Sequence, residues 1–212
     1  MMIKRLLRFV NDRLNIRLIR GSGLIYVTLL VSTVIGTYSN PVICKEIVSN
    51  LPPEYLAAES ISVSISTLLI GMLWKGKTRD VVIRNFMMLA ILETIASIIL
   101  GYWLLFVSYN VWVMAIGSII YVNLISIFIN KCVMMFKSKL FIEKEREDFD
   151  NSSSTINSIA ALLGFGLALL FMPSLKVGIL CWSIACVFDD VGWMYIYFKN
   201  KKHIIENKER DK

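Results

Sequence analysis

Six apolar segments, each long enough to cross a lipid bilayer, alternate with clusters of basic residues along this chain of 212 residues. Most of them have the ~20 residues that a hydrocarbon core of ~30 Å requires of a helix. They lie approximately at 24–43, 56–74, 86–107, 111–129, 156–172 and 177–198. The pattern predicts an all-α polytopic membrane protein, a bundle of six transmembrane helices whose first partner is the lipid bilayer.

Lysine and arginine divide between the two sides of that membrane. Six precede the first segment, four follow the second, five follow the fourth and six follow the sixth, whereas the alternate connections hold only Lys45 and Lys176. Because cytoplasmic connections carry the excess of basic residues, we expect both termini in the cytoplasm. The expected organisation is a basic segment at 1–23, a transmembrane domain at 24–198 and a basic tail at 199–212, in the cell membrane.

A basic chain of this kind could bind nucleic acid. The topology accounts for the formal charge of +7, however, so no nucleic-acid partner is expected. The four cysteines form no C-x-x-C pair, and His203, the single histidine, lies in the polar tail. We therefore expect no zinc site, no disulfide framework and no metal or other cofactor.

Small residues recur at helical spacing in four segments and predict close packing of helix backbones in lipid. The four stripes are Ser60, Ser64, Thr67 and Gly71; Ala90, Thr94, Ser97 and Gly101; Ala160, Gly164 and Ala168; and Gly178, Cys181, Ala185, Asp189 and Gly192. The short outer connections at 108–110 and 173–176 predict that the third and fourth helices, and likewise the fifth and sixth, are antiparallel neighbours. Asp150 and the serines after it are expected to cap the start of the fifth helix.

Three carboxylic acids, Glu93, Asp189 and Asp190, lie well inside the apolar segments. A carboxylate at the centre of a bilayer costs about 2.5–3.5 kcal/mol on insertion scales, so such residues are candidates for substrate or proton binding. No lysine or arginine is expected within a span. The alternatives are therefore protonation, a water-filled cavity, a bound cation, or neutral acids that hydrogen-bond to neighbouring helices. Asp189 is expected to face the bundle, and Asp190 to turn toward Cys186 and Trp193.

Several features resemble one half of a major facilitator superfamily transporter: six spans with both ends inside, a basic connection after the second, and a longer inner connection after the fourth. The stretch from Gly71 to Asp80 is similar to the signature loop of that family. Gly71 and Arg79 fall in register, whereas Lys75 stands where the family has an acidic residue. The resemblance implies that two six-helix halves enclose the substrate, so a chain of this length would pair with itself or with a second half.

Two functions remain open. The first is a half-size secondary transporter acting as a dimer or with a partner half, in which proton exchange drives export of a cationic or amphipathic small molecule. Trp182 and Trp193 are candidates to line its cavity, whereas Trp103 and Trp112 fit interfacial anchors. The second is a non-transporting accessory or immunity-type protein that reuses a transporter-like half fold.

An intramembrane enzyme is not expected. An aspartyl protease would require a Gly-x-Gly-Asp run, but Val187 and Phe188 precede Asp189, and an intramembrane serine protease would require a histidine within the spans.

Overall fold

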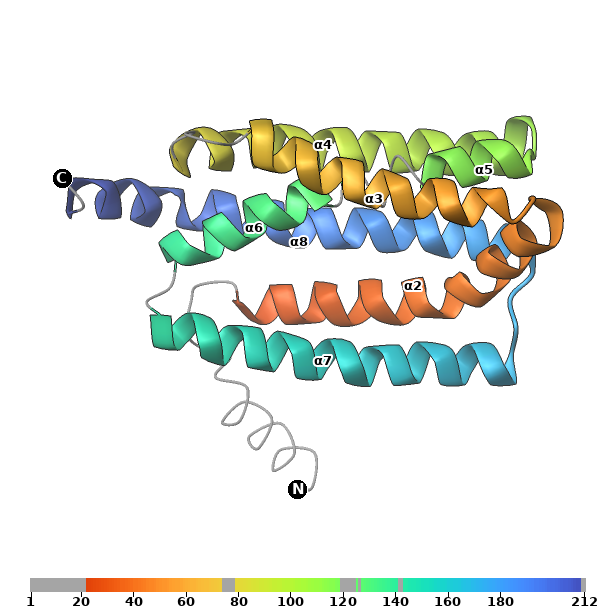
Figure 1. Cartoon of the computed structure of the whole chain (residues 1–212). Coiled ribbons are helices and arrows are strands. Elements are labelled where there is room, and N and C mark those ends of the chain that lie inside the picture. Colours follow the sequence, from red (N-terminus) through yellow and green to blue (C-terminus); the bar gives the residue numbers. More distant parts are fainter. Residues whose placement is uncertain (1–21, 74–78, 119–124, 126, 141–142, 211–212) are drawn as a thin grey trace, which may run out of the picture.

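The computed structural model describes residues 22–73, 79–118, 125, 127–140 and 143–210, and every regular element in these ranges is a helix. In chain order the elements are α2 (Ser22–Asn50), α3 (Glu54–Leu73), α4 (Arg79–Tyr102), the short π-helix η1 (Trp103–Val107), α5 (Val111–Ser118), α6 (Ile127–Leu140), α7 (Glu143–Leu170) and α8 (Leu175–Arg210). Figure 1 shows the helices running roughly parallel or antiparallel to one axis. The expected all-α class is confirmed.

Four stretches of helix are long and apolar enough to cross a membrane. They are Leu24–Asn50, Met87–Val107, Arg146–Leu170 and Leu175–Lys199, and they correspond to the first, third, fifth and sixth predicted spans. The chain therefore has the character of a membrane protein.

The second and fourth predicted spans are less completely described. α3 has 20 residues, of which Ser60–Leu69 form an apolar stretch below spanning length. The fourth predicted span, 111–129, comprises α5 and the first turn of α6, and residues 119–124 and 126 between them lie outside the described part of the chain.

α2 lies between α7 and α8 and packs against both along their lengths (Figure 1). The prediction that the fifth and sixth helices pack side by side is therefore wrong. Phe171–Ser174 form an extended connection that reaches past α2, and the small residues of α7 and α8 each face α2 instead of one another. Pro41 lies inside α2 and removes a backbone hydrogen bond, and the last turns of this helix bend away from the axis of its first part.

Glycine permits the close approach of α2 to both neighbours. A β-carbon on Gly164 of α7 would lie 2.6 Å from the carbonyl oxygen of Val34, and one on Gly192 of α8 would meet the side chain of Thr28. Ala160 and Ala168 of α7 are buried at the same contact. These two stripes pack as the sequence predicts.

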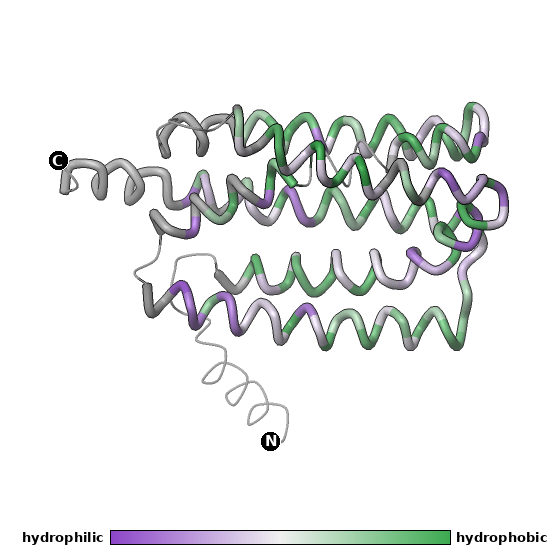
Figure 2. Tube along the Cα trace, in the orientation of Figure 1, coloured by the Kyte–Doolittle hydropathy of each residue, from purple (hydrophilic) through white to green (hydrophobic). Residues whose placement is uncertain are grey.

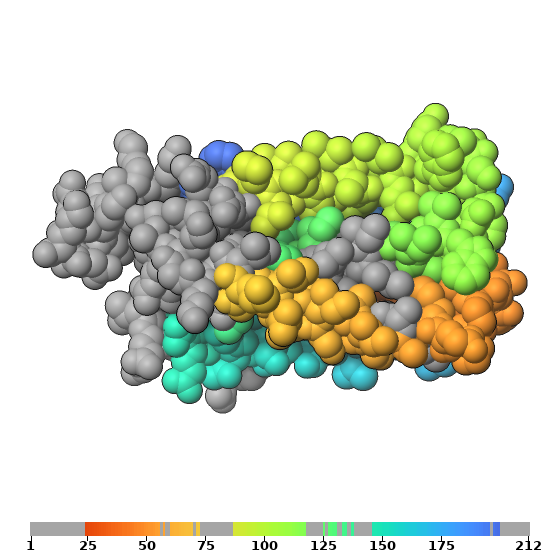
Figure 3. Space-filling view, turned by 45° about the horizontal axis from the view of Figure 1, so that its top comes forward, coloured from red at the N-terminus to blue at the C-terminus, as the bar shows by residue number. Residues whose placement is uncertain are grey.

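The stripe on α3 does not. Ser60, Ser64, Thr67 and Gly71 are exposed, and a β-carbon on Gly71 would meet nothing within 4 Å. Ser66, on another face of α3, is buried. Figure 3 shows α3 lying across the outside of the molecule, and the described residues leave its small-residue face uncovered.

α7 is one continuous helix from Glu143, so the prediction that Asp150 caps its start is wrong. Asp150 instead pairs with Lys137 of α6. Because the mixed-charge stretch before Asp150 has no helix-breaking residue, the helix extends back through it. Apolar residues predominate along the middle of the bundle, and most polar residues lie near its ends (Figure 2). The start of α2 and the end of α8 lie at the same end, together with the α6–α7 connection.

Replacing Gly164 by alanine is expected to destabilise the protein by about 1–3 kcal/mol, because the new methyl group meets the backbone of α2, which cannot rotate away. Gly166→Ala is the matched control. Gly166 lies on the same helix, a β-carbon there would meet nothing within 4 Å, and alanine is the better helix former. Thermal unfolding in detergent measures both, and equal stabilities of the two variants would contradict this packing.

Candidate functional site

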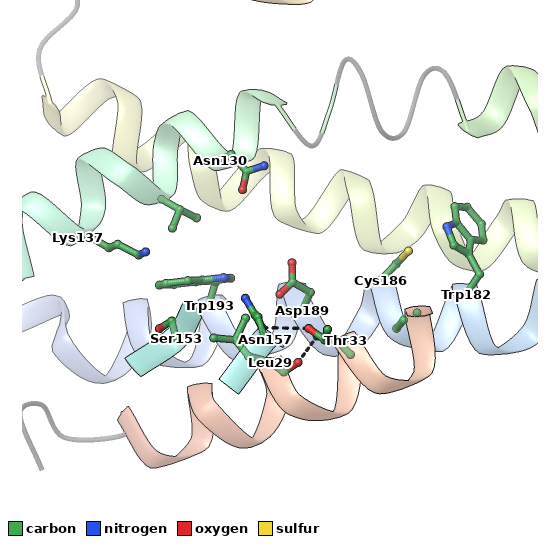
Figure 4. Close-up of a pocket in the computed structure, with 14 residues that line it drawn as sticks. Leu29, Thr33, Asn130, Lys137, Ser153, Asn157, Trp182, Cys186, Asp189 and Trp193 are labelled. Carbon is green, nitrogen blue, oxygen red and sulfur yellow. Dashed lines mark hydrogen bonds between the residues drawn. The ribbon is translucent and has the colours of Figure 1, made fainter. Parts of the chain in front are cut away.

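A cavity of about 440 Å³ lies between α2, α6, α7 and α8. Figure 4 shows Asp189 near its middle, with Lys137 toward one end and Trp182 toward the other. The lining residues are Leu29, Ser32, Thr33, Gly36, Asn130, Val133, Lys137, Ser153, Asn157, Trp182, Ala185, Cys186, Asp189 and Trp193. Polar and aromatic side chains thus face a space at the depth of the spanning helices.

Asp189 is the acidic residue of this cavity. Its side chain is exposed there, although the residue lies near the middle of the Leu175–Lys199 span. An exposed carboxylate at this depth requires water or a cation, because a hydrocarbon environment would not solvate its charge. The expectation that Asp189 faces the bundle is confirmed.

Asp190 faces α4 and not the cavity. Its side chain is buried, and the hydroxyl group of Thr94 donates a hydrogen bond of 2.8 Å to its Oδ2. The expectation that Asp190 turns toward Cys186 and Trp193 is wrong, since those residues line the cavity with Asp189. Cys186 and Trp193 lie three or four residues from both aspartates, so helical spacing alone allows either aspartate to share their face. The packing of α4 against Asp190 determines that Asp189 is the one that does.

Glu93 joins Asp190 at the contact of α4 with α8. Its side chain is buried, and its carboxyl group lies close to that of Asp190. Two buried carboxyl groups this close to one another repel when both are ionised. The structure therefore brings the three predicted acids together on two faces of α8: Asp189 in the cavity, and Glu93 with Asp190 in the packed interface behind it.

Lys137 is a cavity residue that the sequence did not reveal. Its Nζ lies 2.6 Å from Oδ1 of Asp150 and stands over the rings of Phe149 and Trp193, at 5.2 and 5.6 Å from their centroids. The predicted fourth span ended at residue 129, but α6 continues to Leu140. Asn130, Val133 and Lys137 recur at i, i+3 and i+7 on one helical face, and this spacing was the available signal.

Aromatic side chains pack at the Lys137 end of the cavity. The ring of Phe149 stacks on Tyr26 at 5.4 Å and meets Trp193 edge-on at 6.3 Å. All three rings are buried. They connect α2, α7 and α8, and the Lys137 ammonium group lies over two of them, Phe149 and Trp193.

Asn157 supplies neutral polarity nearby. The hydroxyl group of Thr33 donates a hydrogen bond of 3.1 Å to its Oδ1, which links α2 to α7. With its oxygen held in this way, the amide nitrogen of Asn157 is turned toward the cavity (Figure 4). The arrangement provides donors for a polar ligand or for water.

The far end of the bundle is closed by an apolar cluster of Ile47, Leu51, Tyr55, Leu104, Met114, Ala115 and Ile179. The Tyr55 hydroxyl group donates to the carbonyl oxygen of Ala115 at 3.0 Å. Beyond it, the Tyr109 hydroxyl group donates to Oε1 of Glu46 at 2.7 Å. Burial and, next, this hydrogen bond raise the pKa of the Tyr109 phenol above its usual value, so Tyr109 remains a neutral donor that ties α2 to the α4–α5 connection.

The remaining predicted residues lie elsewhere. Gly71 is in the last turn of α3 and Arg79 is the first residue of α4, while residues 74–78 of the signature-like loop lie outside the described residues. Trp182 and Trp193 line the cavity as expected, whereas Trp103 and Trp112 are half exposed at the far end. Among the described residues, no three potential ligands from His, Cys, Asp and Glu gather as a metal site.

Comparison of the chain with known protein families, with curated proteins and with solved structures finds no match. The cavity and the acids around it are therefore the features from which we infer a function.

Thr94→Val is expected to lower stability by about 1–3 kcal/mol, because the buried Asp190 carboxyl group loses a hydrogen-bond donor. Thr67→Val is the control: its hydroxyl group is exposed on α3 and bonds only to the Val63 carbonyl oxygen of its own helix. Chemical or thermal unfolding of both variants in detergent makes the comparison. If Thr94→Val were as stable as Thr67→Val, the hydrogen bond to Asp190 would not contribute to the free energy of unfolding.

Proposed function

We propose that the chain is a half-size secondary transporter, in which the cavity binds a cationic or amphipathic small molecule and Asp189 exchanges it for a proton. The observation that carries the proposal is the exposed Asp189 carboxylate in a cavity of about 440 Å³ midway along a spanning helix. A packing role does not account for a carboxyl group that is exposed in a cavity, because packing would bury it.

Competition for a single carboxylate supports proton coupling. A cation binds best to ionised Asp189, and protonation removes the attraction, so the two ligands oppose one another thermodynamically. Behind Asp189, the buried pair of Glu93 and Asp190 provides two further carboxyl groups that can bind a proton. Alternation between proton and cation at one site is the basis of antiport, and export of the cation against proton entry follows from it.

The proposal includes six spans and cytoplasmic termini. α3 has 20 residues, about 30 Å of helix at 1.5 Å per residue, which matches the hydrocarbon core. The start of α2, the end of α8 and the start of α7 share one end of the bundle. In the sequence these three positions adjoin basic stretches. The excess of basic residues favours the cytoplasm for that end and the cell membrane as the location.

Pairing with a second copy, or with a different six-helix half, is part of the proposal. The resemblance to half of a major facilitator transporter motivates it, and the exposed small-residue face of α3 supports it. Ser64, Thr67 and Gly71 on that face permit close approach of another helix in lipid.

Asp189→Asn is expected to reduce proton-driven uptake of a fluorescent organic cation such as ethidium into inverted vesicles to the background rate, because asparagine neither attracts the cation nor exchanges a proton. Glu147→Gln is the control, since Glu147 is an exposed carboxylate on α7 that does not line the cavity. Fluorescence quenching after imposition of a proton gradient follows the uptake.

Uptake by Asp189→Asn at the rate of the unmodified protein would remove Asp189 from the mechanism. Absence of uptake by the unmodified protein, together with protection of cells from a toxin, would instead favour the accessory or immunity-type function.

A further inference from the structure

The charges around the cavity point to a more specific ligand. We propose that the Lys137–Asp150 ion pair acts as a charge selector, which holds the net charge of the cavity at minus one and thereby favours a ligand with one positive charge on an apolar or aromatic body. The identity of this ligand as cargo rests on the proposed transport function, whereas the selectivity is a property of binding alone.

Among the described residues that line the cavity, two carry formal charges, Asp189 and Lys137. The Lys137 ammonium group is neutralised by Asp150 at 2.6 Å, and its side chain is only 17% exposed against 48% for Asp150. Asp150 thus stands at the rim and Lys137 extends inward. Their charges cancel, and the charge of Asp189 is left for the ligand.

The aromatic residues favour a cation with an apolar body. Trp182 and Trp193 contribute to the lining on either side of Asp189 (Figure 4). The faces of such rings attract cations, most strongly where water is excluded. Lys137 already shows this interaction, since its ammonium group lies over the rings of Phe149 and Trp193.

Charge balance disfavours the other ligand classes. A dication would leave one positive charge uncompensated beside Lys137, and a zwitterion would leave its negative end facing Asp189 or competing with Asp150. An uncompensated charge in a site of low dielectric is costly, so selection follows from the number of charges and not from shape alone. A single positive charge opposite Asp189 leaves the cavity neutral.

The test compares two probes of one skeleton, the N-methyl-bipyridinium monocation and the N,N′-dimethyl-bipyridinium dication, by calorimetric titration of the protein in nanodiscs. The unmodified protein is expected to prefer the monocation. Lys137→Gln should shift the preference toward the dication by on the order of tenfold, the effect of one unit charge at short range in a partly screened site. Asp150→Asn should weaken monocation binding by a similar factor, because Lys137 is then uncompensated.

Lys199→Gln is the matched control. Lys199 also bonds to an aromatic residue, at 2.6 Å from the Tyr195 hydroxyl group and 5.0 Å from that ring centroid, but it does not line the cavity. This variant loses one positive charge and should retain the selectivity of the unmodified protein. Asp150→Asn alters a half-exposed position, so it tests the selector even if Lys137→Gln fails to fold.

Equal preference in all variants, or no monocation binding by the unmodified protein, would overturn the charge selector. Selectivity that changes as expected, with no proton-coupled flux in proteoliposomes, would overturn the transport function and leave the selector standing. The two claims therefore fail by different measurements.

Discussion

Two adjacent aspartates in the middle of a membrane-spanning helix determine how the neighbouring helices pack around it. On insertion scales two adjacent aspartates cost α8 about 5–7 kcal/mol, so this helix cannot simply face lipid along that stretch. The bundle meets the cost in two ways: Asp190 is enclosed with Glu93 and Thr94 at the α4 contact, and Asp189 opens into a polar cavity bounded by α2, α6 and α7. The placement of α8 beside α2 and α4 follows from this division.

The two ends of the bundle differ in character. At one end the apolar cluster around Tyr55 and Ala115 closes the space between helices, and the Tyr109–Glu46 hydrogen bond lies outside it. Toward the other end the cavity reaches Lys137, whose ammonium group lies over the rings of Phe149 and Trp193. The proposed transport function would use this difference between the ends, because alternating access opens a site to one side of the membrane at a time.

Composition and spacing predicted the helical class, four of the helices that are long enough to span a membrane, the packed stripe on α7 and the orientation of Asp189 toward the bundle. These properties depend on local sequence, since hydropathy sets span length and i, i+4 spacing sets a helical face. The separation of α7 from α8 by α2, the environment of Asp190 and the outward face of α3 depend on which helices pack together. The periodicity of residues within one helix does not determine which other helices pack against it.

Lys137 shows the same limit at the level of one residue. The predicted span ended before it, because a lysine after an apolar segment is usually at the membrane boundary. The continuation of α6 brings its ammonium group to Asp150 and over two rings, and a boundary residue becomes part of the cavity. A charge near the end of a span thus acquires its role from the neighbouring helices.

The most direct test of the central claim is whether water reaches position 189 within the bundle. In a variant with the native cysteines replaced by serine, Asp189→Cys is compared with Val191→Cys, which lies two residues further along α8, is exposed and does not line the cavity. A water-soluble methanethiosulfonate reagent should modify the cysteine at 189 and leave the one at 191 unreacted, because thiols ionise and react in water and not in lipid. An unreactive cysteine at 189, or equal reaction at both positions, would contradict a hydrated cavity around Asp189.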